Sequence, residues 1–144
     1  MSALHRATAL ALLLGSLSPT ATWSAGPSQP AHASPSKLEA IPGTSLKRVT
    51  LTERAARRLD IGFGDIRIDP SGRTVVPYAA VLYDPVGDAW VYLNPAPLTY
   101  VRHKIVIDVI NGEEAVLKDG PPAGSKVVVA GVAELYGTEK GVGH

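Results

Sequence analysis

Three residues of this chain carry the side chains of a hydrolytic triad: Ser71, His103 and Asp108. A serine nucleophile needs a histidine base within hydrogen-bond reach and a carboxylate that orients the histidine. His103 and Asp108 are five residues apart on one expected strand, so their side chains point to opposite faces. The chain also lacks a Gly-x-Ser-x-Gly turn. We therefore expect no catalytic residues and a protein that is not an enzyme.

Metal-binding side chains form a second group: His32, His144, Glu113 and Glu114. Together they would make only a loose site, because His32 lies in a proline-rich segment and His144 ends the sequence. Stable metal sites place their ligands at fixed spacing on rigid elements. We expect adventitious metal binding at most, and no cofactor. The ring of His103 is expected at the rim of the core, bonded to a neighbouring group.

The aromatic residues of VVPYAAVLYDPVGDAWVYLNP, residues 75–95, are better candidates for a functional surface. The turn-forming residues DPVGD separate two apolar runs, which predicts a β-hairpin. After the turn, Trp90 and Tyr92 alternate with Ala89, Val91 and Leu93, so the aromatic rings share one face of the strand.

Two interpretations of that aromatic face remain open. Cross-strand aromatic contacts stabilise a hairpin by roughly 0.2–1 kcal/mol. Alternatively, the rings are exposed and bind a partner, because aromatic residues are enriched at binding hot spots. The prolines that follow form a rigid edge that cannot pair with a further strand. The expected docking residues are Tyr83, Trp90, Tyr92, Pro95 and Pro97.

Charge and cysteine content exclude several classes of protein. Without Arg6, the 144-residue chain has 13 basic and 13 acidic residues, and its cysteine count is zero. The closest basic cluster is Arg54, Arg57 and Arg58, mixed with acidic residues, which is typical of a solvated helix face. Nucleic-acid binding needs clustered positive charge, so no nucleic-acid partner is expected. Disulfides, thiol catalysis and a lipid anchor on a cysteine are excluded.

The first 25 residues have the layout of a secretory signal peptide. Arg6 precedes an apolar run over residues 7–17, and small residues follow. Cleavage fits either Ser24-Ala25-Gly26 or Ala31-His32-Ala33, and an uncleaved anchor is the alternative. The run is shorter than the ~20 apolar residues that span a bilayer. We expect a periplasmic or other extracytoplasmic protein that meets the membrane only through a partner or an uncleaved signal.

Residues 26–45 are expected to form a flexible tether. This segment is rich in proline and serine and has few large apolar residues. Such a composition cannot bury itself in a core, and proline stiffens it. The folded domain is therefore expected over residues 46–139, with residues 140–144 as a tail.

The domain is expected to be mainly β, a small antiparallel β-barrel or sandwich with one short N-terminal helix. Thr52 is a natural N-cap for that helix, and Gly62 can end it in the left-handed conformation. Alternating apolar residues predict a long strand in TYVRHKIVIDVING, residues 99–112, and Asn111-Gly112 predicts a hairpin with EEAVLKD. KVVVAG predicts a buried strand, and VAELYG a short helical or turn ending.

Three stretches, in the same order, resemble a known family. They are VTLTERAARRLDIGFGDI, VVPYAAVLYDPVGDAWVYLN and VRHKIVIDVINGEEAVLKDGPPAGSKVVVAGVAELYG. They are similar to the two halves of the membrane-proximal domain in the periplasmic adaptor (membrane-fusion) proteins of resistance–nodulation–division (RND) efflux pumps. The resemblance covers nearly all of residues 48–137.

The chain departs from that family between the two halves. Full-length adaptors insert a β-barrel domain, a lipoyl-like domain and a helical hairpin, where this chain has only residues 69–74. It therefore resembles a stand-alone membrane-proximal domain. It has no methionine beyond Met1, so the methionine copper relay of some heavy-metal adaptors does not carry over.

The resemblance and the signal peptide together imply a non-enzymatic exported accessory of an efflux transporter. Its partner would be an inner-membrane transporter or a split adaptor subunit. The alternative is a stand-alone exported module that binds a ligand or metal.

Overall fold

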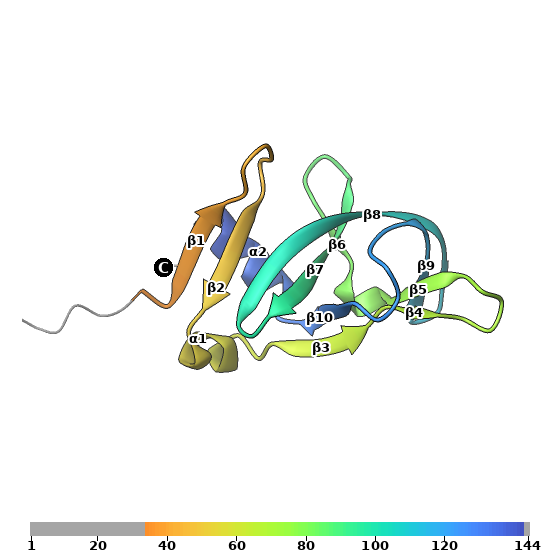
Figure 1. The fold of residues 1–144 in the computed structure, drawn as a ribbon, viewed down its shortest axis with the longest axis horizontal. Helices are drawn as coiled ribbons and strands as arrows, with labels where there is room; N and C mark the ends of the chain where they lie inside the picture. The colour runs from red at the N-terminus through yellow and green to blue at the C-terminus, as the bar shows by residue number, and fades with distance from the viewer. Residues whose placement is uncertain (1–33, 143–144) are drawn as a thin grey trace, which may run out of the picture. The chain divides into compact units, whose positions relative to one another are not determined.

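The computed structural model describes residues 34–142 (Figure 1). The expected signal peptide over 1–25, the first part of the expected tether, His32 and His144 lie outside the described residues.

The described chain is mainly β, as predicted, with two α-helices and one short 3-10 helix. The elements, in chain order, are β1 (Ser36–Ala40), β2 (Lys47–Leu51), α1 (Glu53–Arg58), β3 (Gly62–Asp65), β4 (Arg67–Ile68), β5 (Thr74–Pro77), η1 (Tyr78–Ala80), β6 (Leu82–Tyr83), β7 (Ala89–Ala96), β8 (Thr99–Asn111), β9 (Glu114–Asp119), β10 (Lys126–Ala130) and α2 (Val132–Lys140).

The strands form one antiparallel sheet that nearly closes into a barrel. Its main path runs β3-β10-β7-β8-β9-β5-β4. Only Ile66 separates β3 from β4, so one segment supplies both ends of the path. The Ile66 N–H donates to the Ser125 carbonyl, and the Ile66 carbonyl accepts from the Gly124 N–H. The sheet therefore curls back on the β3–β4 segment.

The two hairpins expected from turn residues are both present. β6 pairs with β7 through Leu82 and Trp90, and β8 pairs with β9 through Asn111 and Glu114. Gly112 has a φ of 58°, which is the left-handed conformation that glycine adopts at little steric cost. The predicted turn at Asn111-Gly112 therefore produces the predicted pairing of β8 with β9.

Two apolar clusters lie on opposite faces of the sheet. The inner cluster fills the barrel with buried side chains from several strands: Ile66, Val76, Ala80, Val91, Ile105, Ala115, Leu117 and Val127. The outer cluster lies where α1 and α2 pack against β2, β7, β8 and β10: Val49, Leu51, Ala55, Tyr92, Tyr100, Val128 and Leu135. Because β7 separates the two clusters, Val91 faces inward and Tyr92 faces outward.

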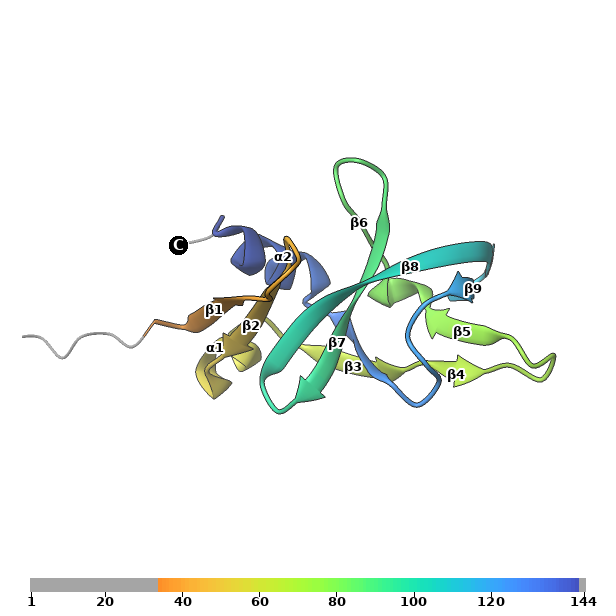
Figure 2. The ribbon, with the colours of Figure 1, turned by 45° about the horizontal axis from the view of Figure 1, so that its top comes forward.

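The expected tether extends too far along the sequence. Ser36–Ala40 forms β1, which pairs with β2 in a continuous register from Ser36–Leu51 to Ala40–Lys47. β1 and β2 lie together at one end of the fold in both views (Figures 1 and 2). Pairing through the backbone holds this segment although it contributes few apolar side chains.

Both helices differ in part from the expectation. Thr52 caps α1 as predicted, with its Oγ1 accepting from the Ala55 N–H at 3.2 Å. Asp60, not Gly62, adopts the left-handed conformation after α1. The expected short ending is a nine-residue helix, α2, that reaches Lys140 and lies beside β1 and β2. Among the described residues, no helix is long and apolar enough to cross a membrane.

Candidate functional site

The expected aromatic hairpin forms, but its aromatic face is not an open patch. Tyr92 has no exposed surface and belongs to the outer cluster. Its hydroxyl donates to Glu139 Oε2 at 2.5 Å. The expectation that Tyr92 docks a partner is therefore wrong, because α2 covers that side of β7.

Glu139 is also the partner of a buried arginine. Arg102 Nε and one terminal nitrogen donate to the Glu139 carboxylate at 3.0 and 3.1 Å. The two side chains are 4% and 1% exposed. A bidentate pair of this kind fixes geometry, and removing either partner would leave an uncompensated buried charge. The pair therefore joins α2 to β8 beside Tyr92.

Aromatic rings surround the Arg102 guanidinium. The guanidinium carbon lies 4.3 Å from the ring centroid of Trp90 and 5.3 Å from that of Tyr136. Trp90 is half-buried, and its indole N–H donates to Asp84 Oδ2 at 3.0 Å. Trp90 thus packs over one side of the Arg102 guanidinium and is itself partly exposed.

Local contacts shift two pKa values in this region. Burial, and then the hydrogen bond to Glu139, raises the pKa of Tyr92 well above its usual range. Burial alone would raise the pKa of Asp84. The hydrogen bonds it accepts from Trp90, Asp88 and Val86 outweigh that effect, so its pKa is lowered. Because its pKa is raised, the Tyr92 hydroxyl keeps its proton and can donate a hydrogen bond to Glu139.

The remaining expected docking residues lie at the two ends of β7. Tyr83 is exposed and pairs with Ala89, where β7 begins. Pro95 and Pro97 are exposed near the turn into β8, where β7 ends. The expected single patch is therefore divided.

Pro97 lines a hollow of about 590 Å³ between α1, β3 and the β7–β8 turn, which we call the β7–β8 hollow. Its lining residues are Glu53, Ala56, Arg57, Asp60, Ile61, Phe63, Pro97, Leu98 and Tyr100. Phe63 is 45% exposed, and its ring stacks on Tyr100 with a centroid distance of 6.4 Å. The lining is apolar apart from three charged residues of the α1 region. An apolar centre with a polar rim is the usual anatomy of a protein–protein interface.

Two strained residues line the same hollow. Asp60 and Leu98 have φ values of 50° and 56°, and they are the described non-glycine residues with positive φ. For an L-residue this conformation costs roughly 1–2 kcal/mol. Such strain persists only where the surroundings impose it, and it is frequent at functional sites.

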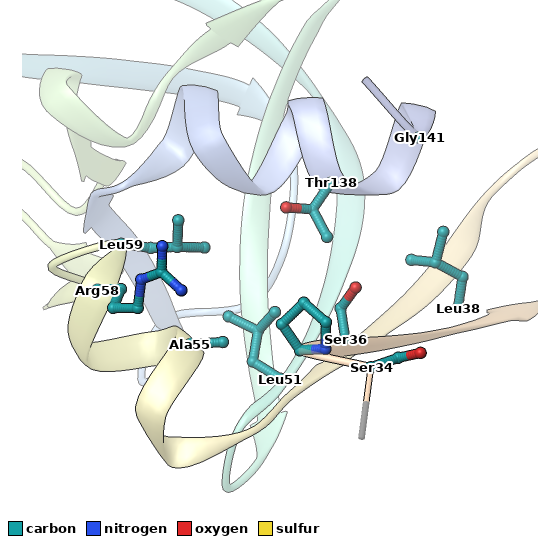
Figure 3. Close-up of a pocket in the computed structure, with 10 residues that line it drawn as sticks. Ser34, Ser36, Leu38, Leu51, Ala55, Arg58, Leu59, Thr138 and Gly141 are labelled. Carbon is teal, nitrogen blue, oxygen red and sulfur yellow. The ribbon is translucent and has the colours of Figure 1, made fainter. Parts of the chain in front are cut away.

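A second depression lies between β1, α1 and α2, and we call it the β1 groove (Figure 3). Its volume is about 670 Å³. The lining residues are Ser34, Pro35, Ser36, Leu38, Leu51, Ala55, Arg58, Leu59, Thr138 and Gly141. Arg58 is the charged residue of this lining, which is otherwise mainly apolar. The expected tether thus forms one wall of the groove.

The candidate triad residues are not brought together. Ser71 lies in the turn between β4 and β5, whereas His103 and Asp108 lie on β8, with β9 between β8 and β5. In the described chain no hydrogen bond joins any two of them. His103 is exposed and forms no side-chain hydrogen bond there, contrary to our expectation. Partial burial nevertheless lowers its pKa.

One of the two glutamates considered as metal ligands has another partner for its carboxylate, because Glu114 forms an ion pair with Arg67. The contact of Glu113 is through its backbone carbonyl, which accepts from the Tyr78 N–H at 2.8 Å. Within residues 34–142, no group of three His, Asp or Glu side chains is close enough to hold a metal ion.

Sequence reasoning missed the Arg102–Glu139 pair and both depressions. The sequence predicts no partner for Arg102 and places Glu139 at the last position of the domain. One signal was available: Glu139 follows the apolar Leu135 by four residues, and residues at that spacing share one helix face.

No protein-family model, curated protein or solved structure matches this chain.

Proposed function

We propose that the chain is a non-enzymatic, exported accessory of an efflux transporter. Its partner is an inner-membrane transporter of the RND class or a split adaptor subunit. The resemblance of residues 48–137 to membrane-proximal adaptor domains motivates this choice of partner, and the apolar segment over 7–17 motivates export.

One observation carries the docking surface. The β7–β8 hollow combines a mainly apolar lining, charged residues of the α1 region and both non-glycine residues of positive φ. Pro97, one of the residues expected to dock a partner, lies in its lining. Exposed Phe63 supplies the large aromatic side chain that binding hot spots favour.

Leu98→Gly tests this proposal without an expected loss of folding stability. Glycine adopts a positive φ at little cost, and Leu98 belongs to neither apolar cluster. We expect a melting temperature equal to or above that of the wild type, and loss of the partner in co-purification from membranes. The partner is identified by mass spectrometry as an RND-class transporter or an adaptor subunit.

Val86→Ser is the matched control, because Val86 is 83% exposed and lies at the far end of β7, in the turn between β6 and β7. It should leave capture unchanged. A folded Leu98→Gly protein that still captures the transporter would refute the hollow as the docking surface. Replacing Trp90 and Tyr92 is unsuitable, since both contact the buried ion pair.

A stand-alone exported ligand-binding module is the second candidate. The β1 groove favours it, because its volume lies within the ~300–1,000 Å³ range of small-molecule sites. Binding of an apolar fluorescent probe, and its loss in Thr138→Trp, would support this alternative. Equal binding by Thr138→Trp would count against it.

A further inference from the structure

β1 is an edge strand with one unpaired side. It pairs only with β2 among the described strands, and it lies at the outer end of the ribbon in both views (Figures 1 and 2). An unpaired edge presents a row of free backbone N–H and C=O groups, which can pair with another chain.

The backbone contacts identify which groups of β1 face outward. The Pro35 carbonyl accepts from the Thr52 N–H, and the Ile41 N–H donates to the Leu46 carbonyl. Residues alternate along an antiparallel ladder. Lys37 and Glu39 therefore direct their backbone groups toward β2, and the backbone groups of Ser36, Leu38 and Ala40 point to the free edge.

We propose that β1 pairs antiparallel with β1 of a second copy of this chain, about a two-fold axis at Leu38. In this register Leu38 of each copy exchanges both backbone hydrogen bonds with Leu38 of the other. Ser36 of one copy lies opposite Ala40 of the other. The interface is the same patch on both copies, as two-fold symmetry requires.

The charges of β1 complement each other in this register. Lys37 of one copy lies opposite Glu39 of the other, and the reverse pair forms on the other side of the axis. These are non-hydrogen-bonded positions, where opposed side chains come closest. In the single chain the same two side chains pair with each other at 3.0 Å. The dimer exchanges the two local ion pairs, one in each copy, for two pairs between copies.

Alternative registers are disfavoured by the same charges. A shift of two residues in one direction places Lys37 opposite Lys37, and a shift in the other places Glu39 opposite Glu39. Like charges directly opposite each other destabilise a sheet. Charges on an edge strand normally prevent pairing; here they permit pairing with an identical strand in one register.

The β1 groove adds an apolar contact to this interface. Ser36 and Leu38 both line the groove, so this face of β1 is the groove side (Figure 3). Leu38 of the second copy lies on the same face of the extended sheet. There it contacts Leu38 of the first copy, which is partly exposed at the rim of the groove. Two five-residue strands bury less than the 1,200–2,000 Å² of a standard interface. The dimer is therefore reversible and concentration-dependent.

Sedimentation velocity of the full chain over a range of concentrations tests the proposal. Lys37→Glu and Glu39→Lys each place like charges opposite each other at both positions. We expect each single variant to weaken dimerisation about tenfold or more. The double variant Lys37→Glu/Glu39→Lys restores complementarity and should dimerise like the wild type. A mixture of the two single variants should form a heterodimer.

These variants separate β1 pairing from other modes of association. Residues outside β1 are unchanged, so association through them would survive every charge reversal. A wild type that stays monomeric at all concentrations, or a dimer unaffected by the single reversals, would overturn the proposal. The proposal does not depend on the efflux function.

Crosslinking provides an independent measurement, because the chain has no native cysteine. Paired residues at the two-fold axis have Cα atoms about 5.5 Å apart, within the range that a disulfide spans. Leu38→Cys should therefore form a disulfide-linked dimer under mild oxidation. Val86→Cys, at an exposed loop position, is the control and should not. Equal crosslinking of both variants would contradict pairing at Leu38.

Discussion

At the scale of single residues, Tyr92 shows that the alternation of apolar residues predicts which face of a strand a side chain lies on, but not what packs against that face. Period-two alternation placed Val91 and Tyr92 on opposite faces, and the two clusters confirm this. The sequence near Tyr92 does not indicate which face of the strand another element covers. Tyr92 is buried because α2 covers it, and Glu139 of that helix, 47 residues later, accepts a hydrogen bond from its hydroxyl.

Tyr92→Phe should destabilise the fold by roughly 1.5–3 kcal/mol at neutral pH, because the lost hydrogen bond has a charged acceptor. The pKa of Tyr92 is raised in the folded state, by burial first and by Glu139 second. The protonated phenol therefore contributes its full stability below the unfolded-state pKa of ~10 and loses it as the pH rises further. The difference between wild type and variant should shrink above pH 10.

Urea unfolding from pH 7 to 11 measures that difference. Tyr136→Phe is the control, because it keeps the ring beside Arg102 and removes a hydroxyl that forms no hydrogen bond in the described chain. It should change stability little at any pH. A constant gap between wild type and Tyr92→Phe up to pH 11 would contradict a raised pKa.

Asp60 shows why the helix end was misplaced. The Asp60 N–H donates to the Arg57 carbonyl and the Ile61 N–H to the Ala56 carbonyl, which is the Schellman pattern. Ile61 and Ala56 also pack against the outer cluster. Burial of Ile61 thus sets the end of α1, and Asp60 takes the conformation for which glycine is the usual residue.

At the scale of elements, the attachment of α2 depends on Gly131, which has a φ of 78° just before the helix. A Cβ at this position would lie 2.8 Å from the Leu59 carbonyl oxygen and 2.5 Å from Ile61 Cδ1. Gly131→Ala should therefore destabilise the fold by more than the roughly 1–2 kcal/mol of left-handed strain.

Gly43→Ala is the matched control for Gly131→Ala. Gly43 has a φ of 77°, and a Cβ there would have no atom within 4 Å. The loss of stability in Gly43→Ala measures the backbone strain alone. Chemical denaturation of both variants then gives the additional loss in Gly131→Ala, which is due to steric crowding of its Cβ. Equal costs would show that α2 moves freely enough to accommodate the methyl group.

The strands were predictable where side chains alternate and turns carry glycine, as in β8, Gly112 and β9. β1 was not, because SKLEA has one large apolar residue and prolines nearby. Its pairing with β2 uses backbone groups, which every sequence offers. The two depressions were equally unpredictable, since each lies between elements that are distant in the sequence.

At the scale of the whole molecule, the folded unit begins earlier than composition indicated. A chain that starts at Leu46 lacks β1 and one wall of the β1 groove, so β2 loses its outer partner. Compared with a chain that starts at Ser34, its melting temperature should be lower by about 5 °C or more, which corresponds to about 1 kcal/mol. Differential scanning calorimetry of the two truncations measures this, and equal melting temperatures would restore the tether interpretation.

The Arg102–Glu139 pair also has a consequence for synthesis. The ribosome adds Glu139 37 residues after Arg102, so the nascent chain carries an arginine destined for burial before its counter-charge exists. Burying that cation alone would cost several kcal/mol. We therefore expect the outer face of β7 and β8 to stay hydrated while the intervening residues are added, and α2 to be the last described element to dock.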